Sequence, residues 1–85
     1  MKTITNMQKV EMLLKDYFDY KDIMQWFGKG KSWACLRLKE YQTRAIAEDV
    51  KLFKGAISTK KFIEYEEIDF DELVSKARLE KELGL

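Results

Sequence analysis

The chain has 85 residues, a length that predicts one small domain. It contains one cysteine and no histidine, which excludes an intramolecular disulfide, zinc fingers and histidine-based catalytic sites. The net charge of +1 is unevenly distributed, because residues 28–61 carry nine bases against three acids (net +6) and residues 62–85 carry three against eight (net −5).

The first predicted element is a helix over residues 6–15. Apolar residues at positions 7, 10, 13 and 14 have the spacing of one helical face, and we expect Asn6 to cap it. The alternative is an irregular arm that ends in a short extended segment at Tyr17 and Phe18.

A short amphipathic helix is predicted over residues 19–27. Asp19 is a favourable N-cap, and Asp22 stands three residues later, where it can complete the first turn. Gly28 suits a left-handed exit from this helix. The side chains expected to face the core are Ile23, Met24 and Phe27.

A second, basic helix is predicted from Ser32, its expected N-cap, to about Val50. We expect Cys35 to be buried within it rather than reactive. The inward stripe of this helix follows the spacing i, i+4, i+7 and i+11 and comprises Ala34, Leu38, Tyr41 and Ala45.

Residues 51–57 predict a short extended segment with a turn at Gly55, which could form one side of a β-hairpin wing. Ser58 is expected to cap a brief helix over residues 59–67.

The last predicted element is an acidic helix that runs to about Leu83. Asp69 and Glu72 have the spacing of a capping box at its start. Its expected core residues are Phe70, Leu73, Val74 and Ala77. The predicted fold is therefore mainly α with little β: a single helix-turn-helix domain, with or without a wing. Its core spans about residues 17–65, between an N-terminal arm (1–16) and the acidic helix (about 69–83).

Two helices joined by a short glycine-containing turn are how helix-turn-helix proteins place a recognition helix in the major groove of DNA. Lys29 and Lys31 flank Gly30 in that turn, where a helix N-terminus also favours anions. We expect them to contact phosphate; an ordinary solvated turn is the alternative. Ser32 either caps the helix alone or also meets a phosphate.

The second helix has an outer face that differs from its core stripe. Its candidate DNA-contacting residues are Trp33, Leu36, Lys39 and Thr43, with Arg37 and Arg44 on one shoulder. Of these, Lys39 and Arg37 are the best candidates for groove or backbone contact, since Arg can bridge guanine O6 and N7. An exposed Trp–Leu pair indicates contact with DNA, with another protein, or with the chain's own N-terminal arm.

The region after the second helix offers Lys54, Lys60 and Lys61 as further phosphate contacts, with a solvated surface as the alternative. The acidic segment 64–72 either deters DNA, recruits a basic partner, pairs with another copy, or serves capping and solubility. It lacks a ligand cluster for a metal, and no second catalytic group accompanies its carboxylates.

The segment DYKDIMQWFGKGKSWACLRL, residues 19–38, resembles small helix-turn-helix proteins of phages and integrative elements, related to excisionases and MerR-type winged helices. The stretch KGAISTKKFIEY, residues 54–65, is similar to the element that follows the long helix in such proteins. Trp33 and Cys35 depart from the usual pattern. The matching positions are Ile23, Phe27, Gly28, Ser32 and Ala34, then Gly55, Ile57, Ser58, Lys60, Lys61 and Phe62.

The sequence thus predicts a non-enzymatic protein of a phage or mobile element that binds double-stranded DNA as a transcription regulator or an excisionase-like factor. The alternative is a small protein-interaction module, such as a phage-encoded modulator of a host or phage protein. We expect no cofactor and no metal, and either dimerisation or cooperative binding. No apolar run approaches the roughly 20 residues of a membrane span, and no signal core is present, so a cytoplasmic location is expected.

Overall fold

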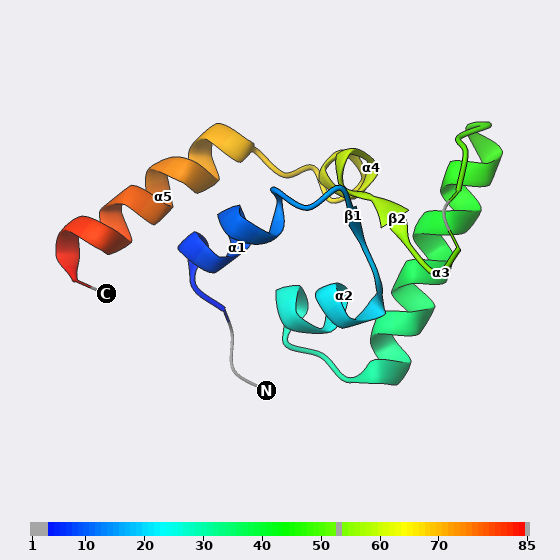
Figure 1. Ribbon diagram of the computed structural model, residues 1–85, viewed down its shortest axis with the longest axis horizontal. Helices are drawn as coiled ribbons and strands as arrows, with labels where there is room; N and C mark the ends of the chain where they lie inside the picture. The colour runs from blue at the N-terminus through cyan, green and yellow to red at the C-terminus, as the bar shows by residue number, and fades with distance from the viewer. Residues whose placement is uncertain (1–3, 53, 85) are drawn as a thin grey trace.

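The chain is mainly helical, as predicted. A computed structural model describes residues 4–52 and 54–84, and within them five helices accompany one two-stranded sheet (Figure 1). In chain order the elements are α1 (Asn6–Met12), β1 (Tyr17–Phe18), α2 (Tyr20–Phe27), α3 (Lys31–Ala47), β2 (Ile57–Ser58), α4 (Thr59–Tyr65) and α5 (Phe70–Leu83).

The molecule is elongated, with extents of 42 × 26 × 17 Å. Helices α1 and α5 pack side by side toward one end of the long axis, and α3 crosses the other end (Figure 1). Helix α2 packs against α3, while α4 contacts both strands and α3. The arrangement separates the basic α2–α3 unit from most of the acidic C-terminal helix.

Phe62 of α4 is the centre of the core. Its ring is fully buried and lies 4.4 Å from the ring centre of Phe18 and 5.2 Å from that of Trp26. Tyr41 of α3 meets the same ring edge-on at 5.7 Å. Aromatic side chains from β1, α2, α3 and α4 therefore hold the helix-turn-helix unit, which consists of α2, α3 and the turn between them, to the rest of the chain.

The predicted start and end of α2 are confirmed. Asp19 accepts a hydrogen bond from the Asp22 backbone N–H, and Asp22 accepts one from that of Asp19, both at 3.0 Å. Gly28 takes a left-handed conformation with φ +64°. Ile23 is buried as expected, with Met24 and Phe27 partly buried against the core; Trp26, which was not predicted as a core residue, is also buried.

Helix α3 buries the predicted stripe of Ala34, Leu38, Tyr41 and Ala45. Its start differs from the prediction, because Gly30 and not Ser32 is the N-cap: the Gly30 carbonyl accepts the Ala34 N–H at 3.1 Å, so the helix begins at Lys31. It ends at Ala47, short of Val50. Cys35 is exposed, so its predicted burial was wrong; it is not part of the inward stripe.

The strand pair joins two distant segments. Tyr17 pairs with Ser58 and Phe18 with Ile57 in antiparallel register. A hairpin wing would pair β2 with a neighbouring strand, whereas β2 here pairs with β1, which precedes α2. The predicted extended segment at Tyr17 and Phe18 is thus present together with the predicted N-terminal helix, which is shorter than residues 6–15.

Helix α1 is attached to α5 by hydrogen bonds at its first turn. Thr5, and not Asn6, is its N-cap. The backbone N–H groups of Asn6 and Met7 instead donate to the Glu80 carboxylate at 2.9 and 3.1 Å. The described part of the N-terminal arm therefore packs along α5.

Helices α4 and α5 begin at the predicted caps. Ser58 accepts the Lys61 N–H at 3.2 Å, and Asp69 accepts the Glu72 N–H at 3.0 Å. Phe70 is exposed, contrary to its predicted core position, because it is the first residue of α5 and precedes the packed stretch. The other three predicted core residues of α5 are buried or half-buried: Leu73, Val74 and Ala77.

Within residues 4–52 and 54–84, none of the helices combines the length and the apolar character that crossing a bilayer requires.

Candidate nucleic-acid interface

The turn between α2 and α3 presents two exposed lysines. Lys29 Nζ lies 6.0 Å from the ring centre of Trp33, and Lys31 Nζ lies 5.4 Å from that of Tyr20. Ser32 is exposed beside them, and no side chain caps the first turn of α3. Uncapped amides at the start of a 17-residue helix, together with two cations, make this turn suited to an anion.

The outer face of α3 is exposed as predicted. The exposed fractions of Trp33 and Leu36 are 37% and 64%, and the Trp33 ring packs edge-on against Phe27 with 5.1 Å between ring centres. The Thr43 hydroxyl donates to the Lys39 carbonyl at 2.9 Å. The described arm contacts α5 and leaves this Trp–Leu pair exposed, so the alternative in which the arm covers it is wrong for those residues.

A surface groove runs between α3 and the segment that follows it. It brings together Lys39, Thr43 and Lys54, which are up to 15 positions apart in the sequence. Its full lining is Lys39, Gln42, Thr43, Ile46, Leu52, Lys54 and Gly55. Gln42 also donates to the Ala56 carbonyl at 3.3 Å, which ties this segment to α3. We refer to this surface groove as the α3 groove. Three of its lining residues, Gln42, Ile46 and Leu52, were not among the predicted site residues.

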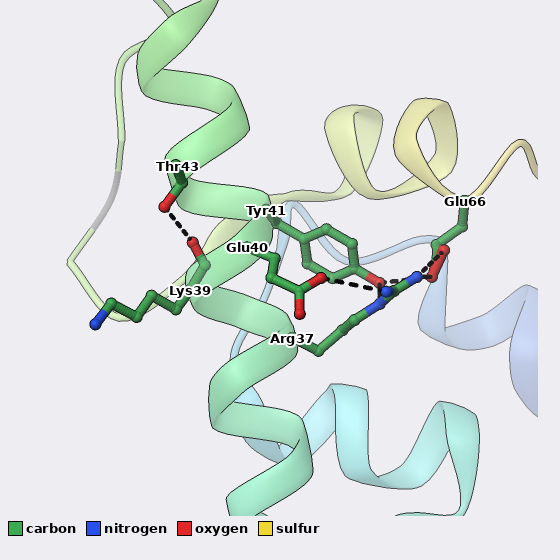
Figure 2. Close-up of polar contacts among 6 residues, drawn as sticks. All are labelled: Arg37, Lys39, Glu40, Tyr41, Thr43 and Glu66. Atoms are coloured by element: carbon green, nitrogen blue, oxygen red, sulfur yellow. Dashed lines mark hydrogen bonds and ion pairs between the residues drawn. The ribbon is translucent and has the colours of Figure 1, made fainter.

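Arg37 is directed away from this groove and into a polar network (Figure 2). Its Nη2 lies 2.8 Å from Oε1 and 2.9 Å from Oε2 of Glu66, and its Nε donates to the Tyr41 hydroxyl at 3.2 Å. Tyr41 in turn donates to Glu66 at 2.7 Å. A weaker contact joins Arg37 to Glu40 at 3.4 Å.

The network changes the protonation equilibria of Tyr41 and Arg37. Burial raises the pKa of Tyr41 well above its usual range, and the hydrogen bond to Glu66 raises this pKa further because it favours the protonated phenol. Hydrogen bonding to Glu66 and Tyr41 raises the pKa of Arg37. The guanidinium is thus a cation already matched by a carboxylate.

Two more predicted contacts are also paired with acids. Lys61 lies 3.2 Å from Glu48 and 2.9 Å from Glu64, and the Arg44 guanidinium lies 4.0 Å from Glu48. Arg44 also stacks 4.3 Å above the Tyr65 ring centre. Lys60 is exposed on α4 and lies outside the α3 groove.

Among the residues that the structure describes, the remaining cations of the basic region form no ion pair: Lys29, Lys31, Lys39, Lys51, Lys54 and Lys60. The sequence did not reveal that Arg37 would meet Glu66 and Lys61 would meet Glu48, because these partners are 29 and 13 residues apart. The Arg44–Glu48 and Lys61–Glu64 pairs, in contrast, have the local helical spacings i,i+4 and i,i+3. The acidic segment 64–72 was the available signal, since its carboxylates Glu64 and Glu66 supply two of the pairs.

Within the described part of the chain, no group of three potential metal ligands comes together. Comparisons with protein families, with curated proteins and with solved structures found no match for this chain.

Proposed function

We propose that this chain is a DNA-binding protein in which α2, the Gly28–Gly30 turn and α3 dock against the major groove. The observation that supports the proposal is the contrast, within residues 28–61, between cations that are paired with acids and cations that are not. Lys29, Lys31 and Lys39 project from the turn and the outer face of α3 with no acid partner among the described residues. A surface of unmatched cations on a helix-turn-helix unit is what a polyanion would contact.

The proposed roles differ among the basic residues. Lys29 and Lys31, at the start of α3, contact DNA phosphates. Lys54 contacts the DNA backbone from the far side of the α3 groove. Lys39 contacts a further phosphate at the edge of the major groove, and Thr43 faces the base edges. Arg37 helps to hold α3 in place against α4, because its guanidinium is bonded to Tyr41 and to Glu66 at the end of α4.

The biological role proposed with this activity is a transcription regulator or an excisionase-like architectural factor of a phage or mobile element, with no catalytic step. A DNA-bending assay separates the two roles, since only the architectural one requires a large bend.

The test is a fluorescence-anisotropy titration of duplex DNA at about 50 and 200 mM salt. The wild-type chain should bind more weakly at the higher salt. A Lys29→Ala/Lys31→Ala/Lys39→Ala variant should bind weakly, with the slope of log affinity against log salt reduced by about 2 to 3, since each phosphate contact contributes about 0.9.

The matched control removes the same number of charges from α5, as Lys76→Ala/Arg78→Ala/Lys81→Ala. These residues are exposed and lie outside the α2–α3 unit. The control should bind DNA nearly as the wild type does. Equal losses of DNA affinity in both triple variants would show that binding depends only on total charge. Absence of wild-type binding at the lower salt would refute the proposal.

A second candidate function, a protein-interaction module, is favoured by one observation. Trp33 and Leu36 are exposed and line a common depression with Arg37 and Glu40. Binding there would depend mainly on apolar burial, so it would persist at high salt, and Trp33→Ala would weaken it more than the triple lysine variant.

A further inference from the structure

Three side chains of α3 have the planar groups that recognise one base through two hydrogen bonds, since arginine pairs in this way with guanine and glutamine with adenine. All three are engaged within the fold. Arg37 lies 2.8 Å from Glu66. Arg44 stacks on an aromatic ring of α4 at 4.3 Å from its centre, and Gln42 donates to the Ala56 carbonyl at 3.3 Å. The helix therefore has to distinguish base pairs by other groups.

The line of α3 that lies farthest from the core consists of Leu36, Thr43 and Ala47. With about 100° between successive residues, these three positions fall within about 40° of one another, on the side opposite the buried stripe. All three residues are exposed. They belong to the lining of a shallow hollow of about 470 Å³, which is completed by Lys39, Glu40 and Arg44. A base edge would meet this outer line if α3 entered the major groove.

The outer line offers base edges mainly carbon. The Thr43 hydroxyl donates to the Lys39 carbonyl at 2.9 Å, so its hydrogen is already used (Figure 2). The side chain still presents a methyl group and an acceptor oxygen. Leu36 and Ala47 have no polar side-chain atom. Apolar side chains distinguish base pairs in the major groove through the C5-methyl group of thymine.

The borders of the outer line suit a polyanion. Lys29 and Lys31 stand at its N-terminal end and Lys39 on one side, and they form no ion pair with the described residues. Glu40 extends to the other side, where its carboxylate lies 3.4 Å from Arg37 (Figure 2). A carboxylate there could accept a hydrogen bond from the amino group of cytosine, which is the competing way to read a base.

We propose that Leu36 and Thr43 contact thymine methyl groups, so that thymine determines which duplex site this chain prefers. This inference rests on the proposed DNA binding. The two residues are two helical turns apart, roughly 10.5 Å, which corresponds to about three base pairs of B-DNA. The preferred site should therefore contain thymines about three base pairs apart. Each contacted methyl group should strengthen binding about 4-fold, the effect of burying one group of this size.

The test begins with the selection of bound duplexes from a random-sequence pool. Fluorescence anisotropy then compares the enriched duplex with the same duplex in which deoxyuridine replaces every thymidine, because this change removes only the methyl groups. The wild type should bind the uracil duplex about 4-fold more weakly for each contacted methyl group. Leu36→Ala should bind the thymine duplex more weakly than the wild type does, and the difference between its two duplexes should be smaller.

The matched control is Leu79→Ala, which shortens an exposed leucine of α5, outside the helix-turn-helix unit. It should keep the full difference between the thymine and uracil duplexes. Leu36 and Leu79 are 64% and 55% exposed, so both variants should retain the wild-type circular dichroism.

Three outcomes would overturn this inference while DNA binding remains. They are equal affinity for the thymine and uracil duplexes, an enriched site defined by guanine or cytosine without thymine, and a thymine preference that Leu36→Ala leaves unchanged. Enrichment of cytosine that is lost in Glu40→Gln would assign base recognition to Glu40 instead. Absence of binding to every duplex, in contrast, would refute the proposed function and this inference with it.

Discussion

The guanidinium of Arg37 and the carboxylate of Glu66 form the principal polar link between α3 and the end of α4. A single guanidinium nitrogen approaches both carboxylate oxygens, at 2.8 and 2.9 Å, and the Tyr41 hydroxyl completes the triangle (Figure 2). The Glu66 side chain is 13% exposed, while that of Arg37 is 35% exposed. The contact therefore lies at the margin of the core, where a lost partner is only partly replaced by water.

Replacing Glu66 should destabilise the fold. We expect Glu66→Gln to lower the free energy of unfolding by about 1–2 kcal/mol, because the amide removes the charge that matches Arg37. The measurement is urea unfolding followed by circular dichroism. Glu40→Gln is the matched control: it touches the same guanidinium at 3.4 Å from an exposed position, and should cost less than about 0.5 kcal/mol. Equal effects of the two variants would contradict this account.

The raised pKa of Tyr41 predicts a loss of stability at alkaline pH. Burial and the hydrogen bond to Glu66 favour the protonated phenol in the folded chain. Above the unfolded pKa of about 10, the unfolded chain therefore binds fewer protons than the folded one, so stability falls as pH rises. Tyr41→Phe should be less stable at neutral pH but should lose stability less steeply above pH ~10. Thermal unfolding across this range tests the prediction, and parallel profiles for the two proteins would refute it.

Local patterns predicted the helices well. The buried stripe of α3 from Ala34 to Ala45 could be predicted because it follows from the 3.6-residue period of a helix. The caps of α2, Asp19 and Gly28, could be predicted because capping depends on only a few neighbouring residues. The errors at Ser32 and Asn6 are also local. At both helix starts a neighbouring residue, Gly30 or Thr5, takes the cap position.

Contacts between distant residues were out of reach of the sequence. The pairing of Phe18 with Ile57 joins segments separated by the whole helix-turn-helix unit, and neither segment carries a sign of the other. Likewise, the helical period places Arg37 on a shoulder of the outer face that contains Lys39, but it does not show that Arg37 meets Glu66, which is 29 residues away. The candidate site was therefore predicted in its outline but not in which of its cations remain unmatched.

The N-cap residue of α3, Gly30, has no side chain that could cap the helix, so this position offers a stabilising substitution. Gly30 has φ −76° and ψ 172°, and an added Cβ would meet no atom within 4 Å. Gly30→Ser should therefore supply an N-cap hydroxyl and restrict the unfolded chain, raising stability by roughly 0.5–1 kcal/mol. Gly28→Ser is the opposing control, because φ +64° strains any side chain there and should cost about 1 kcal/mol. Urea unfolding should shift in opposite directions for the two variants, and destabilisation by Gly30→Ser would contradict the inferred cap geometry.

Lys39 and Arg37, two positions apart on α3, should respond differently when replaced by alanine. Lys39 forms no ion pair with the described residues, so Lys39→Ala should change stability by less than about 0.5 kcal/mol. It should nevertheless weaken duplex binding and reduce the salt slope by about 0.9. Arg37→Ala should leave that slope near the wild-type value, since Glu66 already neutralises the guanidinium, while lowering stability by about 1–3 kcal/mol. Anisotropy titrations and urea unfolding on both variants separate the roles. A salt slope lowered more by Arg37→Ala than by Lys39→Ala would show that DNA draws Arg37 away from Glu66.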